Sequence, residues 1–329
     1  MQPQKRILSG MRPTGRLHLG NLHGALLNWV ELQDSYESFF FVADWHALTS
    51  NFEDTSDISA ATRDMLLDWL SAGLDPKKAT LFVQSHILEH AELYLLLGMI
   101  TPVPWLERNP TYKEQIVQMQ NKDLSNFGFL GYPILQAADI IIYKAWGVPV
   151  GIDQVPHVEL TREIARRFNY LYGETFSEPE VVLTKTSKIL GLDRRKMSKS
   201  YNNAIYFTEP EDQVLKKISR MVTDPQRMRK DDPGNPDVCN VYDFHKLYSS
   251  AETTAEINED CRNATIGCVA CKKILGQNLA NILAPYREKR TQLESQPNLV
   301  SDIITDGDKR ARKIAQQTMA EVHERLHLS

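Results

Sequence analysis

Short apolar segments alternate with helical segments along the first half of the chain, and this alternation constrains the fold more than any other feature. Segments 7–9, 39–43, 81–84 and 148–150 are short and apolar, which predicts buried strands. Segments 22–33, 65–70 and 93–100 carry apolar residues at helical spacing. This order predicts an α/β fold with a doubly wound parallel sheet and helices on both faces.

The strand signal nearly vanishes after about residue 205. Segments 214–222, 265–283 and 309–326 show apolar residues three and four positions apart, which predicts helices. A chain of 329 residues has room for about two domains. We therefore expect an α/β domain over 1–205 and a smaller all-α domain over 206–329, with a last helix from about 308 that packs back on the first domain or stays apart.

Composition limits the classes of function. A net charge of −4 argues against a protein that coats nucleic acid, which needs a dense positive field. No uncharged stretch reaches the roughly 18 residues that span a bilayer, and the first residues lack the apolar core of a signal peptide. We expect a cytoplasmic protein with no membrane partner.

A turn with the sequence PTGRLHLGNLHG (13–24) follows the first predicted strand and opens the first helix. Its glycines would let a ligand approach the backbone. His18 and Asn21 stand three residues apart at the first helical turn, where side chains and free amides can hold a polyphosphate. The dinucleotide fingerprint GxGxxG is missing there. An ordinary strand-to-helix turn is the alternative interpretation.

A second candidate is RRKMSKS (194–200), with four cations and two hydroxyls in seven residues. Positive charge on a loop suits an enzyme that displaces phosphate, because it stabilises the negative charge that grows in the transition state. The commoner origin of such a run is a solvated basic loop.

HLGN (18–21) and KMSKS (196–200) resemble the paired signatures of class I aminoacyl-tRNA synthetases, in the same chain order. Within that class, YPILQAADI (132–140), VPVGIDQ (148–154) and ELTRE (159–163) are similar to tryptophanyl-tRNA synthetases. The similarity covers essentially the whole chain. It implies a Rossmann-like catalytic domain that activates tryptophan with ATP and Mg²⁺ and transfers it to the 3′-terminal adenosine of tRNA(Trp), and it implies a homodimer.

For tryptophan, the resemblance implies that Asp139 accepts the indole N–H. An indole nitrogen is a donor only, so one buried carboxylate in an apolar pocket recognises it well. Tyr132 and Gln154 match positions that hold the α-ammonium group, and His46 and Gln136 match positions in the same pocket. The alternative for Asp139 is a cap or ion pair on its own helix.

For ATP, the resemblance implies contacts with the base, the ribose and the phosphates from Arg12, Gly20, Asn21, Gly151, Asp153, Lys196, Met197, Ser198 and Lys199. The catalytic set that it implies is His18, Asn21, Lys113, Lys196 and Lys199. The chemistry requires no protein nucleophile, because positioning and charge stabilisation supply the rate.

All four cysteines lie between positions 239 and 271. Disulfides are rare in the cytosol, so a metal or cluster site and buried thiols remain. Cys261, Cys268 and Cys271 are seven and three residues apart and would share one helix face, with Cys239 approaching from the preceding loop. Four thiolates suit zinc or an iron–sulfur cluster. The pattern resembles a subset of bacterial tryptophanyl-tRNA synthetases, which implies a 4Fe-4S cluster, with zinc as the lesser alternative.

By the same resemblance, the helical domain binds the anticodon. A basic stretch over 216–230 is a candidate RNA surface or a solvated helix face; its cations are Lys216, Lys217, Arg220, Arg227, Arg229 and Lys230.

Three other functions compete with a tryptophan enzyme. They are a tyrosine-specific enzyme, an RNA-binding paralogue without catalysis, and an iron–sulfur electron carrier. The HLGN and KMSKS motifs and Asp139 favour the enzyme.

Overall fold

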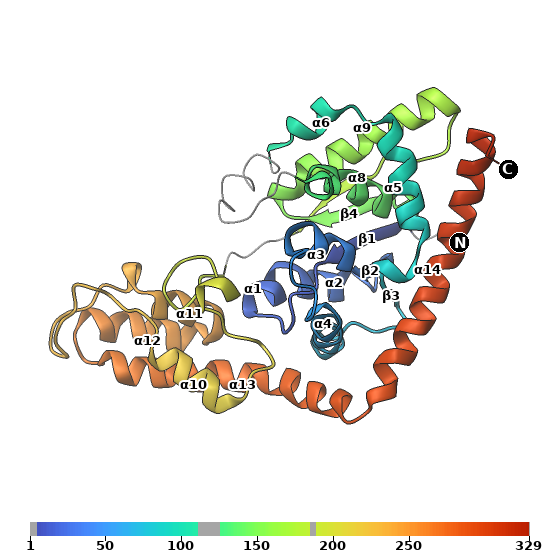
Figure 1. Cartoon of the computed structure of the whole chain (residues 1–329). Helices are drawn as coiled ribbons and strands as arrows, with labels where there is room; N and C mark the ends of the chain where they lie inside the picture. Colours follow the sequence, from blue (N-terminus) through green and yellow to red (C-terminus); the bar gives the residue numbers. More distant parts are fainter. Residues whose placement is uncertain (1–4, 111–125, 185–188, 329) are drawn as a thin grey trace. The chain divides into compact units, whose positions relative to one another are not determined.

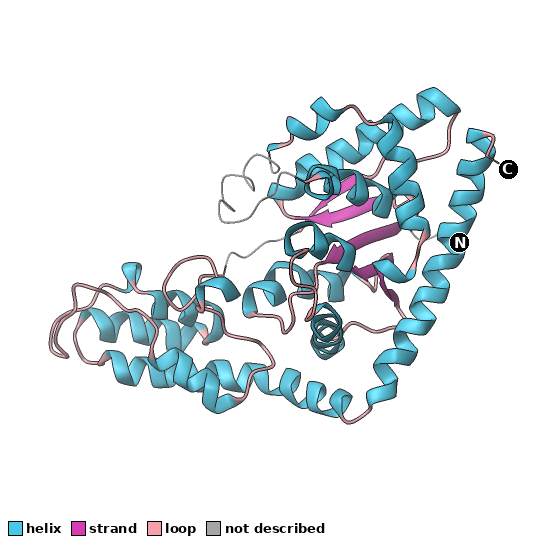
Figure 2. Cartoon of the chain, viewed as in Figure 1, coloured by secondary structure: helices cyan, strands magenta, loops and turns pink. Residues whose placement is uncertain are grey.

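The computed structural model describes residues 5–110, 126–184 and 189–328. Within them it contains a five-stranded parallel sheet in the order β3-β2-β1-β4-β5 (Figures 1 and 2). The strands are β1 (Arg6–Met11), β2 (Glu37–Val42), β3 (Ala79–Val83), β4 (Gly147–Val150) and β5 (Glu180–Leu183). The chain starts at β1, moves outward to β3 and then returns to build the other side. This is a doubly wound, Rossmann-like sheet, so the predicted fold class is confirmed.

Helices cover the sheet and make up the rest of the chain. Those before β5 are α1 (Leu19–Asn21), α2 (Leu27–Leu32), α3 (Asp44–Asn51), α4 (Ile58–Ala72), α5 (Glu89–Ile100), α6 (Val103–Glu107), α8 (Phe127–Ile141) and α9 (Val155–Tyr172). Those after β5 are α10 (Glu211–Ser219), α11 (Asn240–Tyr248), α12 (Ala251–Arg262), α13 (Cys268–Glu294) and α14 (Pro297–Leu326). Short turns of helix are η1 (Leu22–Leu26), η2 (Gln84–His86), η3 (Ile152–Gln154), η4 (Lys199–Tyr201) and η5 (Pro236–Val238).

Both faces of the sheet are buried, because successive strand residues point to opposite faces. Phe40 of β2 stacks on Trp29 of α2 with ring centroids 4.6 Å apart, and Trp29 meets Trp69 of α4 edge-on. The preceding residue, Phe39, packs on the opposite face against Tyr143, which follows α8. The apolar strands are therefore sandwiched between two helical layers.

The last helix, α14, covers the edge strand β3 (Figure 1). Asp308 accepts a hydrogen bond from the backbone N–H of Val83 at 3.2 Å, and Arg310 donates to the carbonyl of the first β3 residue. Gly307 makes the closest approach: a Cβ at this position would lie 1.7 Å from the carbonyl oxygen of Leu81. The helix expected from about 308 begins at 297, and it packs on the sheet.

Over the described residues the chain forms two compact units. The sheet unit comprises Met1–Gly15, Asn28–Thr186 and Gln296–Ser329, and the helical unit comprises Arg16–Leu27 and Ser187–Ser295. This division differs from a single boundary at 205, because both signature motifs belong to the helical unit. The reason is backbone pairing: the N–H of Leu19 donates to the carbonyl of Ile205 at 2.9 Å, and that of Phe207 donates to Leu17 at 3.3 Å.

The sequence pattern missed β5 and set several helix ends too short, most clearly for α13 and α14. Beyond residue 189 the described elements are helices, as predicted. Among the described residues, no helix has both the length and the apolar character needed to cross a bilayer.

Candidate active site

In the helical unit, the HLGN turn begins α1 with a reciprocal cap. The N–H of Asn21 donates to Nδ1 of His18 at 3.3 Å, and the N–H of His18 donates to Oδ1 of Asn21 at 3.1 Å. Because Nδ1 of the imidazole is an acceptor, the proton of the neutral ring lies on Nε2. The cap does not use Nε2–H of His18 or the side-chain NH₂ of Asn21, so these two groups are the hydrogen-bond donors that the side chains of this turn can offer to a ligand.

The HLGN and KMSKS motifs are close within this unit. Burial, and after it the positive charges of Lys199 and Lys196, lower the pKa of His18 to about 4. His18 is therefore neutral at pH 7. A Cβ on Gly20 would lie 3.0 Å from the His18 ring and 3.8 Å from the side chain of Met197, which is 3 % exposed. A helix N-terminus with two lysines beside it is a suitable anion site.

The four cations of the KMSKS segment divide into two pairs. Arg194 donates to the carbonyl of Val238 at 2.6 Å. Arg195 pairs with Asp193 at 2.7 Å and lies over the ring of Tyr201. Arg194 therefore ties the loop to the segment before α11, whereas Arg195 makes contacts within the loop. The two lysines, Lys196 and Lys199, are the cations whose charge acts on His18.

Asn203 shapes this loop, and the sequence analysis did not single it out. It is 2 % exposed, and its Oδ1 accepts from the N–H of Ser198 at 2.8 Å. Its Nδ2 donates to Asp193 and to the carbonyl of Lys196. The buried side-chain amide of Asn203 therefore connects three residues of the loop. These bonds fix the backbone conformation from which the lysine side chains extend.

In the sheet unit, polar residues gather where the parallel strands end. Arg12 follows β1, His46 lies on α3 after β2, Gln84 directly follows β3, and 151–154 follow β4. Ligands of open α/β sheets bind at this edge. The sheet therefore brings together residues that are up to 140 positions apart in the sequence.

Asp139 on α8 is the most buried charged group of this region, at 1 % exposure. His46 Nε2 lies 2.7 Å from Oδ2, and His90 Nδ1 lies 2.6 Å from Oδ1. Gln84 Nε2 donates to both oxygens, at 2.8 and 2.9 Å. Burial alone would raise the pKa of Asp139, but hydrogen bonds from the two histidines outweigh it and hold the pKa below the usual value. The carboxylate is ionised.

A second polar group stands beside Asp139 on the same helix face. This group is Tyr132, seven residues earlier, whose hydroxyl oxygen lies 3.4 Å from Nε2 of His157. The side-chain amide of Asn109 donates to Nδ1 of the same imidazole at 3.2 Å. Burial, and after it the neighbouring His46, lower the pKa of His157 to about 4. His157 is thus a neutral spacer between α9 and α8.

The low pKa of His157 predicts acid sensitivity of the fold. In the unfolded chain His157 has a pKa near 6.5 and binds a proton below that pH, whereas in the folded chain it binds the proton only near pH 4. Stability is therefore complete above pH 6.5 and falls as the pH drops from 6.5 to 4, by up to about 3 kcal/mol from this residue. We expect His157→Gln to flatten this part of the pH dependence of the free energy of unfolding. Urea unfolding at several pH values measures it, and an unchanged slope would contradict this assignment.

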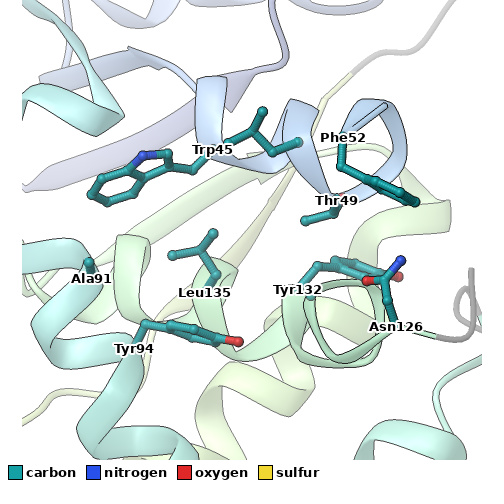
Figure 3. Close-up of a pocket in the computed structure, with 10 residues that line it drawn as sticks. Trp45, Thr49, Phe52, Ala91, Tyr94, Asn126, Tyr132 and Leu135 are labelled. Atoms are coloured by element: carbon teal, nitrogen blue, oxygen red, sulfur yellow. The ribbon is translucent and has the colours of Figure 1, made fainter. Parts of the chain in front are cut away.

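An apolar pocket of about 460 Å³ opens between α3, α5 and α8 (Figure 3). Trp45 and Thr49 line it from α3, and Phe52 from just after that helix. Ala91 and Tyr94 line it from α5, and Tyr132 and Leu135 from α8. Tyr132 is common to this pocket and to the His157 pair. The pocket gives the sheet unit an apolar cavity next to buried polar groups, as is usual for small-molecule sites.

The remaining candidate residues are placed as follows. Gln136 lies between Tyr132 and Asp139 on α8 and is half-buried. Gln154 donates to the exposed Asp153 at 3.3 Å, and the charge of Asp153 acts on His157. Gly151 caps η3. Lys113 lies outside the described residues.

The four cysteines lie on three helices, so the expectation of one shared helix face is wrong. Cys261 is in the last turn of α12, which ends at Arg262, whereas Cys268 and Cys271 are in the first turn of α13. Cys239 is the N-cap of α11. Ala264, with φ of +60°, lies in the turn that separates α12 from α13.

The cysteines nevertheless gather at one place. Burial and, to a lesser extent, the three other thiols raise the pKa of Cys271 to about 12, so the four cysteines lie in one region. They form no disulfide. Among the described residues, however, no group of three or more His, Cys, Asp or Glu side chains has a geometry that could hold a metal ion. The donor types fit a thiolate-ligated group, but the arrangement of the described side chains does not.

The basic stretch is only partly a surface. Lys217 pairs with Glu209, and Arg227 donates to the carbonyls of Lys230 and Ile266 at 2.6 and 2.8 Å. Arg227 also points Nη1 at Sγ of Cys261, 3.8 Å away. Arg227 is therefore a structural residue of the cysteine region. The exposed cations are Lys216, Arg220, Arg229 and Lys230.

Three residues of the sheet-unit site were missed by the sequence analysis, namely Gln84, His90 and His157. Position offered a signal for the first two: Gln84 comes directly after a buried strand, and His90 lies in the first turn of the next helix. His157 lies in the first turn of α9, just after the VPVGIDQ segment.

A family model described as class I tRNA synthetases (W and Y) matches residues 2–284. The tryptophan–tRNA ligase of Thermotoga maritima is 53 % identical over 325 residues, which cover 98 % of this chain and 99 % of that protein. The tryptophan–tRNA ligase of Aquifex aeolicus is 45 % identical, covering 98 % and 100 %. Among solved structures, the tryptophanyl-tRNA synthetase of Campylobacter jejuni, complexed with ADP and tryptophan, matches with a TM-score of 0.89 and 34 % identity over 98 % of this chain and all of that one. This chain belongs to the class I tRNA synthetases and, within them, to the ATP-dependent tryptophan–tRNA ligases.

Proposed function

We propose that this chain activates L-tryptophan with ATP to tryptophanyl-adenylate and pyrophosphate, and then transfers tryptophan to the 3′-terminal adenosine of tRNA(Trp). The observation that carries the choice of tryptophan is the ionised, buried Asp139, because an indole nitrogen needs an acceptor. The Campylobacter jejuni relative is complexed with ADP and tryptophan, which supports an adenine nucleotide and tryptophan as the ligands. We propose that the reaction takes place in the cytoplasm, as the family resemblance implies.

The residues of the helical unit provide the chemistry of phosphate displacement. The tryptophan carboxylate attacks the α-phosphorus, and pyrophosphate leaves as its Mg²⁺ complex. His18 Nε2–H and the Asn21 amide donate to phosphate oxygens, while Lys196 and Lys199 stabilise the charge that grows on them. No residue has to be covalently modified, because the work is positioning and electrostatics.

The other ATP contacts follow the family resemblance. We propose that Gly20 and the backbone of Met197 adjoin the base and that Ser198 belongs to the loop over the phosphates. Gly151 and Asp153 are proposed for the ribose, and Arg12 for the phosphates.

Amino-acid-dependent pyrophosphate exchange tests the function. We expect exchange with tryptophan and about a thousandfold less with tyrosine. A site that places an acceptor for the indole N–H does not match the position of the tyrosine hydroxyl. Charging of tRNA(Trp) completes the test. Exchange with tyrosine alone would identify a tyrosine enzyme, and no exchange with either would identify a paralogue without catalysis.

We also propose that Cys239, Cys261, Cys268 and Cys271 hold a 4Fe-4S cluster, with zinc as the lesser alternative. The support is the convergence of four free thiols from three helices. Binding would need these side chains to adjust, because their present arrangement does not suit a metal. A bound cluster would supply a cross-link that ties the end of α12 to the beginnings of α11 and α13.

Metal content is the measurement that decides between these groups. Protein purified without air is expected to show broad visible absorption and about four irons per chain, both lost in Cys271→Ser. Tryptophan-dependent exchange should persist in that variant, since the cysteines and the HLGN and KMSKS motifs are separate sets. Colourless protein with about one zinc would favour the structural alternative. Metal-free protein with four titratable thiols would contradict both.

We propose that the helical unit binds the anticodon of tRNA(Trp) through its exposed cations. Arg229 is exposed. We expect Arg229→Glu to raise the KM for tRNA about tenfold, because the variant loses a contact with a phosphate and places a negative charge that repels it. Tryptophan-dependent exchange should not change. Charging assays at two salt concentrations measure it. An equal loss of exchange and charging would show that Arg229 supports the fold rather than RNA binding.

A homodimer is the proposed assembly. Helix α5 and its flanks expose Leu88, Leu95, Met99 and Val103, with exposed fractions of 50 to 74 %. Apolar side chains gathered on one helix mark an interface, and a second copy of this chain is the occupant that the family resemblance implies. Sedimentation equilibrium of wild type and of Met99→Glu tests it: a monomeric wild type would contradict it.

A further inference from the structure

The hydrogen bonds around Asp139 point to a second residue that recognises the substrate. We propose that Gln84 is a specificity-determining residue. Its amide carbonyl would accept a hydrogen bond from the indole N–H, in addition to the one that Asp139 accepts. This inference rests on the proposed function, in which Asp139 binds the indole ring. Gln84 is 0 % exposed and lies at the carboxyl end of β3, where ligand-binding residues of such sheets gather.

The carboxylate of Asp139 has its acceptor positions filled. Two carboxylate oxygens offer about four lone-pair positions. His46 takes one on Oδ2, His90 takes one on Oδ1, and Nε2 of Gln84 contacts both oxygens. An arriving indole N–H therefore has to share an oxygen with a donor that is already there.

His90 is the donor least able to move. Its Nε2 lies 2.7 Å from the hydroxyl of Tyr143, and both side chains are fully buried. Burial, and then the charge of Asp139, raise the pKa of Tyr143, so the hydroxyl keeps its proton and donates it to His90. The ring then donates from Nδ1 to Asp139. Moving His90 would break two hydrogen bonds, whereas Gln84 can give up one of its two contacts and keep the other.

The carbonyl oxygen of Gln84 is the unexplained atom of this network. The amide nitrogen must face the carboxylate, because two oxygens would repel, so the orientation of the amide is fixed by chemistry. Oε1 is then buried and has no hydrogen-bond partner among the described residues. A buried acceptor without a donor is costly, and such atoms in native structures call for an explanation.

A donor that reaches Asp139 would explain this atom, because Oε1 and Nε2 are bonded to the same carbon. The indole N–H is such a donor. An aromatic side chain of the same shape without an N–H would leave Oε1 unpaired, so Gln84 would act against it. This mechanism adds discrimination to that of the carboxylate alone.

The test compares tryptophan with β-(3-benzothienyl)alanine, in which sulfur replaces the indole N–H. Pyrophosphate exchange gives kcat and KM for each, and calorimetry gives each dissociation constant. In Gln84→Met the preference for tryptophan over the analogue is expected to fall about tenfold or more, mainly through the KM of tryptophan. The control is Gln33→Met. Gln33 is also buried in the sheet unit, but it bonds Gly73 and Asp75, so the preference should not change.

Each outcome separates the inference from the proposed function. If Gln84→Met weakens both ligands equally, or keeps the wild-type preference while Asp139→Asn loses it, Gln84 is not a specificity residue and the proposed role of Asp139 stands. If the wild type itself shows no preference, the proposed recognition of the indole N–H fails. If Gln84→Met does not fold, Gln84→Asn replaces it, because the shorter amide withdraws from the carboxylate, and the same change in preference is expected.

Discussion

The Asp139→Asn variant is expected to lose about 10³-fold in kcat/KM for tryptophan, with the KM for ATP within about twofold of the wild type. The substitution keeps the shape of the side chain but replaces one acceptor oxygen by a donor. His46, His90 and Gln84 all donate to this carboxylate, so one of them would face an N–H group. Tryptophan-dependent exchange, titrated separately in each substrate, measures both constants.

A matched control distinguishes loss of recognition from loss of the fold. Asp68 is also fully buried, on α4 of the same unit, so Asp68→Asn removes a buried carboxylate outside the site. We expect Asp68→Asn to lower thermal stability and to leave the KM of tryptophan unchanged. If Asp139→Asn is destabilised to the same degree and its kcat/KM for tryptophan remains normal, Asp139 is structural only.

The second large effect is expected for Lys199→Ala, with kcat for adenylate formation falling about 10²- to 10³-fold. Of the two lysines that act on His18, Lys199 is the one whose charge lowers the pKa of His18 more. A cation there stabilises charge that develops on the phosphates in the transition state. The KM for tryptophan should stay unchanged, because the loss concerns the transition state and not the binding of the amino acid.

Arg195→Ala is the control for Lys199→Ala. Arg195 is in the same loop and carries the same charge, but it pairs with Asp193 and lies over Tyr201. Its loss should lower kcat less than about tenfold, as expected for a solvent-exposed ion pair. Single-turnover measurements of adenylate formation compare the two variants. Equal effects would mean that the total charge of the loop matters, and not the position of Lys199.

The sequence predicted the sheet well because strand–helix alternation leaves few topologies. It predicted the elements of the site less evenly. HLGN and KMSKS were found because the residues of each motif are adjacent in the sequence. Gln84, His90 and His157 were not found, because each stands outside any motif and its hydrogen-bond partners come from distant parts of the chain.

The cysteines illustrate the same limit. Seven and three residues of spacing fit one helix face, but α12 ends between Cys261 and Cys268, in a turn where Ala264 takes a positive φ. The spacing of the cysteines does not report this break, although Asn263 and Gly267 in the segment between them are weak helix formers. Arg227 was misjudged for a related reason: sequence gives the charge of a side chain but not the direction in which the backbone points it.

The cover that α14 provides for β3 bears on how the protein is made. Val83 and Asp308, which share a hydrogen bond, are separated by 225 residues. A ribosome that has just finished β3 must therefore synthesise most of the remaining chain before this edge is shielded. Throughout that interval the nascent sheet presents unpaired backbone groups that another chain can extend. Slow elongation or premature termination before residue 308 would favour aggregation, and chaperones that hold nascent chains would be needed most at this stage.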